Sequence, residues 1–467
     1  MKAPLHLLTA LLLTVLPPLK AADVPGRGLS AEWSVAWKGG GVSVLAVKTL
    51  RDEPTGLVRI ASGEAVSLEV TLRGRTPRSV DVLPRKPGAS SAVNGDELLI
   101  SLPGPGTWTV VAKANHEYVL HIVVQAPAKP PAILRPEHFF GPGIHDVDTI
   151  SLRDGEALWL DPAAVLRPRI PAASEKPVVE KDWAGMKAWQ PFISAIGAKQ
   201  VSIRGGGTID LSGLPWHARH AAAFCRCKNV TVDGLTIIDA PTWGVALFQC
   251  KTALIRNVVN ISYRENSDGI DLCNSRDVIV EDCFFRTNDD GVCVKTTAPP
   301  PASIAENILV RRVTVWNERA RALGITSETR NDIRNVRFTD CDVIRDYSAD
   351  GECCALAVLV ADRGTMSDIV FEQIRIEHCQ NTLATLWIRP DVWGKDRQRG
   401  HVNGVRFDQI ELAAGIQPRI RLEGFDDQHR IESVRISGLH RGGKPIPDAS
   451  AAGVAANDFA SGIAVEP

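Results

Sequence analysis

A short unit of alternating apolar and polar residues recurs from residue 230 onward and constrains the fold more than any other feature. In each copy a polar pair separates two short apolar runs, as in VTVDGL, VIVEDC and VRFTDC. The alternation requires β-strands, and copies that start 23 to 36 residues apart predict one coil of a right-handed parallel β-helix each. The copies begin at Val230, Ala253, Val278, Ile308, Val336, Ile369, Val405 and Val434.

The predicted β-helix spans residues 133–445. The varying distance between copies places insertions in the turns, which is where a solenoid carries its binding surface. A leucine-rich repeat is the structural rival, but its LxxLxLxxN pattern does not occur. We therefore expect an all-β protein.

Two neighbouring coils carry similar acidic units, NSDGI at 266–270 and NDDGV at 288–292. Aligning their glycines places Asp268 level with Asp290, 22 residues later, which is a plausible length for one coil. Successive coils stack at roughly 4.8 Å, so both carboxylates would share one sheet face with Asp289 beside them. Like charges at that range raise one another's pKa, which suits a general acid near neutral pH. The alternative is that these residues cap turns.

These units, read as NSDGID and NDDGVCVK, resemble the NTDGxD and GDDxxxxK/N signatures of glycoside hydrolase family 28, the polygalacturonase-like enzymes. Downstream, LGITSET at 323–329 and IRNV at 333–336 resemble the IGSET…IRNV stretch of that family. The resemblance covers roughly residues 135–445. It implies an inverting glycoside hydrolase that needs no metal or cofactor and cleaves a pectic or other polysaccharide or oligosaccharide.

Carried over residue by residue, the resemblance implies catalytic roles for the three aspartates. Asp289 would be the general acid, and Asp268 and Asp290 would position and deprotonate the attacking water. Asn266 and Asn288 would orient these carboxylates through side-chain hydrogen bonds, with plain turn capping as the alternative.

Three further residues are candidate substrate contacts. Lys295 could contact substrate or lower a neighbouring carboxylate's pKa, and an outward salt bridge is the alternative. Trp243 is level with Asp268 one coil earlier, where it could stack on a sugar or pack in the core. Arg321 could bind a substrate carboxylate or sulfate, or lie at the solvated rim.

The chain departs from the family pattern in two places. RARA at 319–322 stands where polygalacturonases carry the His of a GHG motif, and Arg321 is closest to that position. The Arg-x-Lys motif that holds the substrate carboxylate should fall near 356–359, where LAVL supplies no cation, so Arg321 or Arg363 would have to replace it. Trp387 and Arg389, followed by the loop 391–400, are a candidate distal subsite.

These departures keep two alternatives open. The first is a polysaccharide lyase of the same fold that acts on uronates and often needs calcium. The second is a carbohydrate-binding or surface protein that has lost catalysis, although retention of all three aspartates argues against it.

Residues 23–125 have a different character and predict a small antiparallel β-sandwich, in which tryptophans pack in the core rather than bind sugar. A Pro-rich linker at 126–132 follows it, and the Ala-, Gly- and Ser-rich residues 446–467 predict a loosely packed tail. The expected strands of the sandwich are 33–37, 42–47, 65–72, 98–102, 108–112 and 118–124.

Charge and targeting signals limit the partners. With 53 basic and 54 acidic residues, the chain gives no reason to expect nucleic acid or an anionic membrane as partner. Residues 1–22 read as a secretory signal peptide, and no later apolar run is long enough to span a membrane. We therefore expect a secreted, soluble monomer with no membrane insertion.

All ten cysteines lie between Cys225 and Cys379, without zinc-type spacing. We expect mostly buried thiols, with room for one or two disulfides.

Overall fold

The computed structural model of the protein describes residues 28–131, 134–170, 178–179, 188–349 and 353–467. The expected signal peptide lies outside these ranges, and so does the last residue of the expected linker. Among the described residues, the one helix is a single 3₁₀ turn at Pro136–His138. None of this part of the chain forms a helix that is long and apolar enough to cross a membrane.

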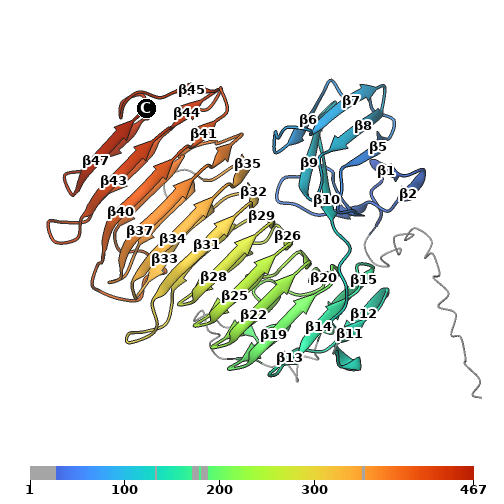
Figure 1. Ribbon diagram of the computed structural model, residues 1–467, viewed down its shortest axis with the longest axis horizontal. Coiled ribbons are helices and arrows are strands. Elements are labelled where there is room, and N and C mark those ends of the chain that lie inside the picture. The colour runs from blue at the N-terminus through green and yellow to red at the C-terminus, as the bar shows by residue number, and fades with distance from the viewer. Residues whose placement is uncertain (1–27, 132–133, 171–177, 180–187, 350–352) are drawn as a thin grey trace, which may run out of the picture.

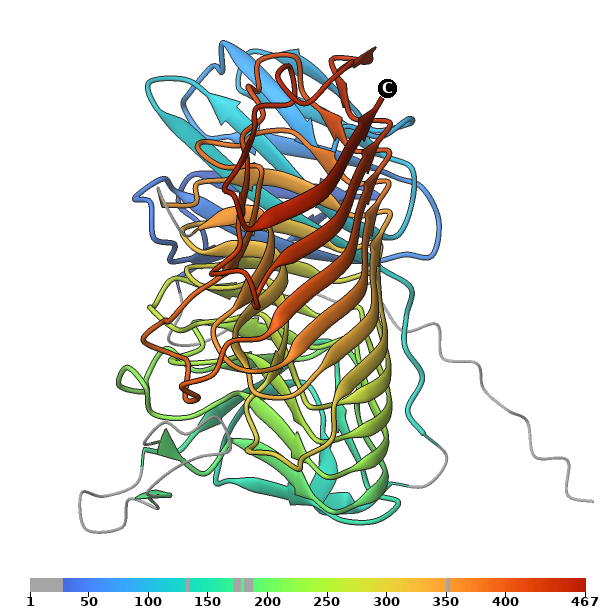
Figure 2. The same ribbon diagram turned by 90° about the vertical axis from the view of Figure 1, so that its left-hand side faces the viewer.

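Three long sheets wind into the predicted right-handed parallel β-helix (Figures 1 and 2). Each coil passes in turn through what we call the repeat sheet, the interface sheet and the site sheet. The repeat sheet contains β11 (Phe139–Phe140), β14 (Ala157–Leu160), β19 (Lys199–Arg204), β22 (Lys228–Asp233), β25 (Lys251–Arg256), β28 (Arg276–Glu281), β31 (Ala305–Arg311), β34 (Ile333–Thr339), β37 (Thr365–Glu372), β40 (His401–Asp408), β43 (Ile431–Ser437) and β47 (Ala460–Glu466).

The other two sheets complete each coil. The interface sheet contains β12 (Gly143–Val147), β15 (Ala164–Pro168), β20 (Thr208–Asp210), β23 (Thr236–Ile238), β26 (Val259–Ser262), β29 (Phe284–Thr287), β32 (Thr314–Asn317), β35 (Asp342–Asp346), β38 (Arg375–Ile376), β41 (Glu411–Leu412), β44 (His440–Arg441) and β45 (Lys444–Pro445). The site sheet contains β13 (Ile150–Leu152), β18 (Ile193–Ile196), β21 (Ala222–Cys225), β24 (Val245–Phe248), β27 (Ile270–Cys273), β30 (Val292–Thr296), β33 (Arg321–Thr329), β36 (Cys354–Val360), β39 (Ala384–Ile388), β42 (Ile420–Glu423) and β46 (Val454–Ala456).

The strand register places the first residues of all eight sequence repeats in one column of the repeat sheet. Val230 pairs with Ala253, which pairs with Val278, and the column continues in the same way to Val434. The inward side chains of this column and its neighbours form the apolar interior. Phe338, Phe371 and Phe407 stack face to face on successive coils, with ring centroids 4.9 and 5.2 Å apart.

The polar pair inside each repeat forms the corner between the repeat sheet and the interface sheet. Its second residue has a positive φ in every coil, for example 54° at Asn257 and 55° at Asp282. Asn, Asp and Gly tolerate this left-handed conformation better than other residues. The whole set is Gly234, Asn257, Asp282, Arg312, Asp340, Gln373, Gln409 and Gly438.

Two five-stranded sheets precede the β-helix and enclose a separate apolar core, as a β-sandwich does. One sheet has the order β2-β1-β5-β8-β7 and the other β3-β4-β10-β9-β6. Their bounds are β1 (Trp33–Trp37), β2 (Gly40–Val42), β3 (Leu45–Val47), β4 (Thr55–Ala61), β5 (Val66–Leu72), β6 (Ser79–Leu83), β7 (Ser90–Asn94), β8 (Glu97–Leu102), β9 (Gly106–Lys113) and β10 (Glu117–Gln125).

The sandwich differs from the prediction in three respects. Strands β4, β6 and β7 were not expected, and the single strand expected at 42–47 is divided between the two sheets, because the chain crosses from one to the other after Val42. The pairing of β4 with β10 is parallel, whereas the sandwich was expected to be antiparallel. Most of β4 is buried, so it lacks the alternation that identifies a half-exposed strand.

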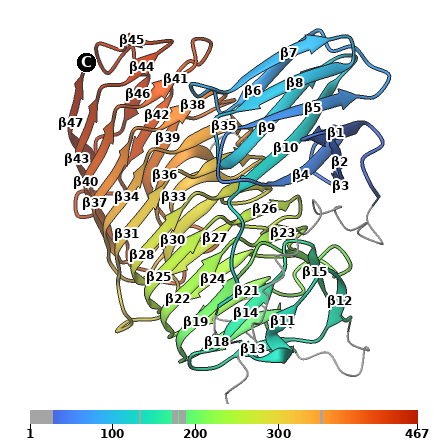
Figure 3. The same ribbon diagram turned by 45° about the vertical axis from the view of Figure 1, so that its right-hand side comes forward.

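The sandwich packs against the outer face of the interface sheet (Figure 3). Leu57, Val119 and Val123 from β4 and β10 meet Phe284 and Trp316 from β29 and β32 in one buried apolar cluster. The contact covers the middle coils of the β-helix and leaves the site sheet on another face.

The C-terminal segment differs from the loosely packed tail expected at 446–467. It forms β46 and β47, which add one further strand to the site sheet and to the repeat sheet. Val434 pairs with Ile463, so the apolar column of the repeats continues into the last coil. This strand escaped prediction because the small residues around it hide the alternation.

All ten cysteines are free thiols, and none forms a disulfide, although the sequence left room for one or two. Eight are buried, and Cys353 and Cys379 are partly exposed. Most of them line the coils as small apolar side chains.

The remaining short strands, β16 (Val178–Val179) and β17 (Ala188–Trp189), form a two-stranded antiparallel pair outside the three main sheets.

Candidate active site

The two acidic units lie on neighbouring strands of the site sheet in the register that the sequence predicts. Ile270 pairs with Val292, and the backbone amide of Gly269 donates to the carbonyl of Asp290. Asp268 and Asp290 therefore occupy equivalent positions on successive coils, roughly 4.8 Å apart along the helix axis.

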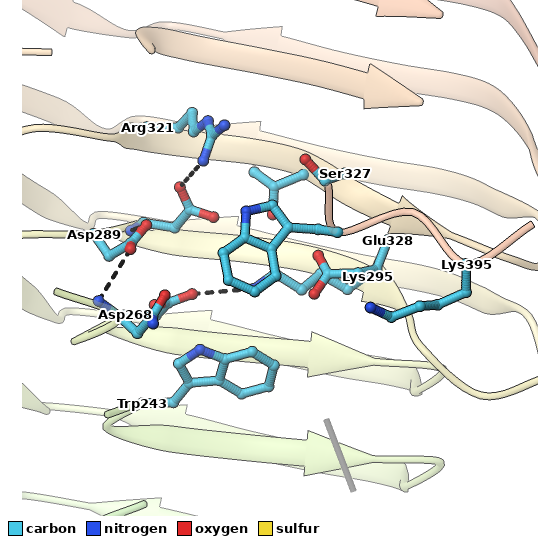
Figure 4. A pocket seen from close by; sticks show the side chains of 12 residues that line it. Trp243, Asp268, Asp289, Lys295, Arg321, Ser327, Glu328 and Lys395 are labelled. Carbon is cyan, nitrogen blue, oxygen red and sulfur yellow. Dashed lines mark hydrogen bonds and ion pairs between the residues drawn. The ribbon is translucent and has the colours of Figure 1, made fainter. Parts of the chain in front are cut away.

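Trp243 and Arg321 extend this column on either side. Pairing of β24 with β27 sets Trp243 level with Asp268, and pairing of β30 with β33 sets Arg321 level with Asp290. Figure 4 shows the labelled side chains in this order, from Trp243 through Asp268 and Asp289 to Arg321. The guanidinium of Arg321 contacts the carboxylate of Asp290, with Nη1 and Oδ1 3.4 Å apart.

Asp289 is half-buried at the wall of the pocket, and the backbone holds its carboxyl group in place. Its Oδ2 accepts a hydrogen bond from the amide of Asn266 at 3.1 Å, and its Oδ1 accepts one from the amide of Asp290 at 3.0 Å. Burial, followed by the charges of Asp268 and Asp290, raises the pKa of Asp289 to about 8. A carboxyl group with that pKa is protonated at neutral pH and can donate a proton.

Lys295 points into the site rather than outward. Its ammonium lies 3.0 Å from Oδ2 of Asp268 and 2.8 Å from Oδ1 of Asp271, and 4.1 Å from the ring centroid of Trp243. Burial alone would lower the pKa of Lys295, but the two carboxylates raise it well above its ordinary value. Lys295 therefore pairs with carboxylates inside the site, and the alternative of an outward salt bridge does not apply.

Asp271 is a site residue that the sequence analysis did not single out. It is the last letter of NSDGID and faces outward, because side chains alternate along a strand and its neighbours Ile270 and Leu272 pack in the apolar interior. Burial raises the pKa of Asp271 to about 6, although the positive charge of Lys295 acts to lower it. Burial and the charge of Asp271 raise the pKa of Asp268 well above its ordinary value.

These groups form what we call the pocket cluster. Four carboxyl groups share two cationic side chains, and Oδ1 of Asp268 and Oδ2 of Asp271 have no hydrogen-bond partner among the described residues. Burial alone would lower the pKa of Arg321, but the charges of Asp290 and Asp289 raise it. The members are Asp268, Asp271, Asp289, Asp290, Lys295 and Arg321.

A β-bulge shapes the next wall of the pocket. Val294 pairs with Ile325 but Thr296 pairs with Thr329, so three residues of β33 stand opposite Lys295 alone. Bulges often redirect side chains beside active sites, and here Ser327 takes a positive φ of 38° while Glu328 faces the pocket. Burial raises the pKa of Glu328.

The loop after β39 closes the far side of the pocket with Trp393 and Lys395, which the sequence analysis did not name. Hydrogen bonds fix this loop, because the backbone amides of Lys395 and Asp396 both donate to Oδ1 of Asp362 at 2.6 Å. The carboxylate of Asp396 in turn pairs with Arg363 at 2.8 Å.

The pocket brings together most of the predicted residues. Asn288 is an exception, since it is buried and does not line the pocket. Neither asparagine orients a carboxylate with its side chain as predicted, because that of Asn266 bonds the ring of His217 and that of Asn288 donates to the carbonyl of Tyr263. The lining residues are Trp243, Asn266, Asp268, Asp289, Asp290, Lys295, Arg321, Thr326, Ser327, Glu328, Trp393 and Lys395.

The expected distal subsite at Trp387 does not form as predicted. Trp387 is only 1% exposed and packs in an apolar cluster with Leu359 and Ala361 on the outer face of the site sheet. Arg389 stacks over its ring at 4.7 Å. The loop that follows contributes to the main pocket instead.

One group of side chains could hold a cation. Oxygens of Asp268 and Asp290 and the sulfur of Cys293 lie within 4.8 Å of one another. The ammonium of Lys295 already supplies a positive charge to Asp268 at 3.0 Å, so a metal ion would have to compete with it.

The fold is similar to those of two solved structures. An exopolygalacturonase from Thermotoga maritima superposes with a TM-score of 0.56 at 19% identity, over 70% of this chain and 83% of that one. Dex49A from Penicillium minioluteum superposes with a TM-score of 0.58 at 12% identity, over 96% of both chains. The second likeness therefore includes the N-terminal sandwich.

The sequence is similar to plant polygalacturonases over part of its length. A probable polygalacturonase of Arabidopsis thaliana is 24% identical over 224 residues, which is 43% of this chain and 47% of that protein. A polygalacturonase of Persea americana is 26% identical over 161 residues, or 31% and 34% of the two chains. The matched stretches thus span about half or less of the length of these curated relatives.

A sequence model of glycosyl hydrolases family 28 matches residues 173–412, which is just over half of the chain. This range contains every residue of the pocket cluster. The chain therefore belongs to glycosyl hydrolases family 28, as a divergent, polygalacturonase-like member.

Proposed function

We propose that the protein is a secreted, inverting glycoside hydrolase that cleaves a pectic polysaccharide or oligosaccharide. The observation that carries this proposal is the convergence of Asp268, Asp289 and Asp290 on one pocket, where two backbone amides hold the carboxyl group of Asp289 and burial raises its pKa to about 8. Hydrolysis of a glycoside needs such an acid to protonate the leaving oxygen.

The other two aspartates have the surroundings of a base and a water-positioning group. Asp290 contacts Arg321, which supplies a counter-charge to its carboxylate. Asp268 shares Lys295 with Asp271 and has one oxygen without a protein partner among the described residues, so it can hold a water. We assign removal of the water's proton to Asp290 and orientation of that water to Asp268.

A single displacement follows from these roles. Asp289 donates its proton to the leaving oxygen while the glycosidic bond breaks, and water attacks the anomeric carbon as Asp290 takes its proton. The anomeric configuration is thereby inverted. Before the next turnover Asp289 takes up a proton from solvent and Asp290 releases one to it.

A cation on the pocket rim supports an acidic sugar as substrate. Residues 356–359, where the family's Arg-x-Lys motif was expected, are buried in the sheet, and Arg363 pairs with Asp396. Lys395 lines the pocket, is exposed, and makes no ion pair with the described residues. We assign recognition of a substrate carboxylate to Lys395, and the curated polygalacturonases similar to this chain favour the same class of substrate.

Secretion remains part of the proposal on the strength of the signal-like residues 1–22 alone. N-terminal sequencing of exported protein would show whether the leader is removed.

Hydrolysis is tested by reducing-sugar release from a panel of polygalacturonate, rhamnogalacturonan, xylan, arabinan and dextran. Asp289→Asn and Asp290→Asn should each lower kcat on the responsive substrate by about 10²- to 10⁴-fold, because each removes one proton-transfer partner. Thermal unfolding of both variants serves as the folding control. NMR of the first anomer released from the wild type checks inversion.

Three results would contradict the proposal. Unchanged release by Asp289→Asn would remove the acid, and unsaturated products that vanish with a chelator would indicate a lyase. Binding of a glycan by the wild type without any release would indicate a carbohydrate-binding protein.

A further inference from the structure

Two tryptophans are exposed at opposite edges of the pocket, while the other described tryptophans of the chain are buried or partly buried. Trp216 is 55% exposed and Trp393 is 42% exposed. Trp183 lies outside the described residues. An indole combines an apolar ring with a polar N–H group, and for this reason tryptophan is enriched at binding interfaces.

The two tryptophans lie at opposite ends of the strands of the site sheet. Trp216 lies in the turn before β21, on the edge where Asn266 and Asp289 precede their strands. Trp393 lies in the loop after β39, on the opposite edge, because all strands of this sheet run parallel.

Trp216 is exposed yet held in one orientation. Its indole N–H donates to the carbonyl of Glu265 at 3.0 Å, and its ring stacks on that of His217 with centroids 3.7 Å apart and planes at 25°. The carboxylate of Glu265 pairs with Arg319 at 3.1 Å, which connects the loop before β27 to a later coil. An indole fixed before the ligand arrives loses little conformational entropy on binding.

A chain of contacts connects this indole with the proposed general acid. The ring of His217 is hydrogen-bonded to the side-chain amide of Asn266, which lines the pocket. The backbone amide of Asn266 donates to Oδ2 of Asp289 at 3.1 Å. Trp216 therefore adjoins the pocket on the side of Asp289, the group from which the leaving oxygen receives its proton.

A pyranose ring has an apolar face of C–H groups that suits a flat aromatic surface, while its hydroxyls remain in water. We propose that Trp216 is a stacking platform for the sugar on the leaving-group side of the scissile bond. This inference rests on the proposed function, since it takes the Asp289 side as the leaving-group side. It assigns the protein a binding position for a second sugar outside the acidic pocket.

The test measures affinity as a function of oligosaccharide length. Calorimetry in the Asp289→Asn background compares Trp216→Ala with its parent, using galacturonic acid, its dimer and trimer, and the matching galactose series as neutral probes. Trp216→Ala should weaken trimer binding on the order of tenfold and leave monomer binding within about twofold. Trp216→Phe should recover part of the trimer affinity, because it restores an aromatic face.

A matched control and the wild-type activity separate the explanations. Phe425→Ala removes an aromatic side chain that is 41% exposed but does not line the pocket, and it should change no affinity. Equal losses for monomer and trimer would show that Trp216 only supports His217 and Asn266, and would overturn the inference. An unchanged trimer affinity, or no binding by either protein to any probe, would also overturn it. Wild-type hydrolysis, measured separately, decides the proposed function independently of these affinities.

Discussion

Two clusters of buried charge, one on the interface sheet and one on the site sheet, differ in how completely their charges are satisfied. In the interface cluster the guanidinium of Arg286 bonds Glu318, with Nε and Oε1 2.8 Å apart, and also contacts Glu53 and Nε2 of His121. Arginine has only donors, so Nε2 of His121 accepts and its Nδ1–H donates to Thr109. Burial, followed by the charge of Arg286, lowers the pKa of His121 well below its ordinary value.

The interface cluster is closed, because two carboxylates face two guanidinium groups and none of their oxygens is buried without a partner. Both carboxylate oxygens of Glu318 are engaged, one by Arg286 and the other by Arg51. The pocket cluster has four carboxyl groups for two cations, and two of its buried oxygens lack a partner among the described residues. Structural ion pairs are retained when they are satisfied, whereas unbalanced charge in a pocket marks a site that acts on something else.

Arg286→Met tests the structural side of this comparison and should have the largest effect. Removing one partner of a buried ion pair costs about 3–5 kcal/mol, here because Glu318 and Glu53 would stay buried without their counter-charge. We expect a large drop in the urea midpoint of unfolding, and an unchanged kcat for the folded enzyme, because the pocket cluster lies on another sheet.

The surface pair of Arg435 and Glu466 provides the matched control. Arg435 is 57% exposed, with Nη2 and Oε2 2.6 Å apart, and Arg435→Met should cost no more than about 1 kcal/mol. A loss of kcat in Arg286→Met without a loss of stability would show that the interface cluster takes part in function. The distinction between a structural interface cluster and a functional pocket cluster would then be wrong.

The pH dependence tests the unbalanced side. Asp289 has a folded-state pKa of about 8, so the active, protonated acid is lost above that pH, and kcat should fall about tenfold per unit beyond it. The raised pKa also favours the protonated form in the folded state. Its contribution to stability is therefore present at low pH and is lost as pH rises from about 4 through about 8.

Asp289→Asn should weaken this pH dependence of stability without abolishing it, because the raised pKa values of Asp268 and Asp271 act in the same direction. Asp427→Asn removes a carboxylate that is 90% exposed and should change neither profile. The free energy of unfolding is measured by urea unfolding from pH 4 to 9. If it falls equally steeply with pH in Asp289→Asn and in the wild type, the pKa of Asp289 is not raised by folding.

The features that sequence revealed are those repeated from coil to coil. The polar pair identifies a corner because the left-handed backbone there favours Asn, Asp and Gly, and the same spacing aligned Asp268 with Asp290. Trp243 and Arg321 were placed correctly for the same reason. A solenoid makes such inference reliable, since each coil contacts its neighbours in a fixed register.

The features that sequence missed depend on departures from that register. Glu328 faces the pocket because of a bulge, and Lys395 reaches it from a loop four coils after the first aspartate unit. Trp216 donates to Glu265 and His217 is hydrogen-bonded to Asn266, each across 49 residues of sequence. Asp271 was present in the motif, and a count of outward-facing positions after the turn could have found it.

Lys395→Gln sharpens the comparison with the smallest expected effect. The pocket cluster is acidic, so it should repel a uronate unless a cation at the rim offsets that charge, and Lys395 is the exposed pocket residue able to do so. An exposed ionic contact contributes about 0.2–1 kcal/mol, which predicts a rise in KM for oligogalacturonides of roughly two- to fivefold and no change in kcat. The effect should shrink at high salt, because the interaction is exposed, and be absent for a neutral oligosaccharide.

Lys444→Gln, on an exposed strand at the end of the interface sheet, is the control. An equal rise in KM for neutral and acidic substrates would show that Lys395 shapes the loop rather than recognising a carboxylate, and the proposed preference for an acidic sugar would lose its support.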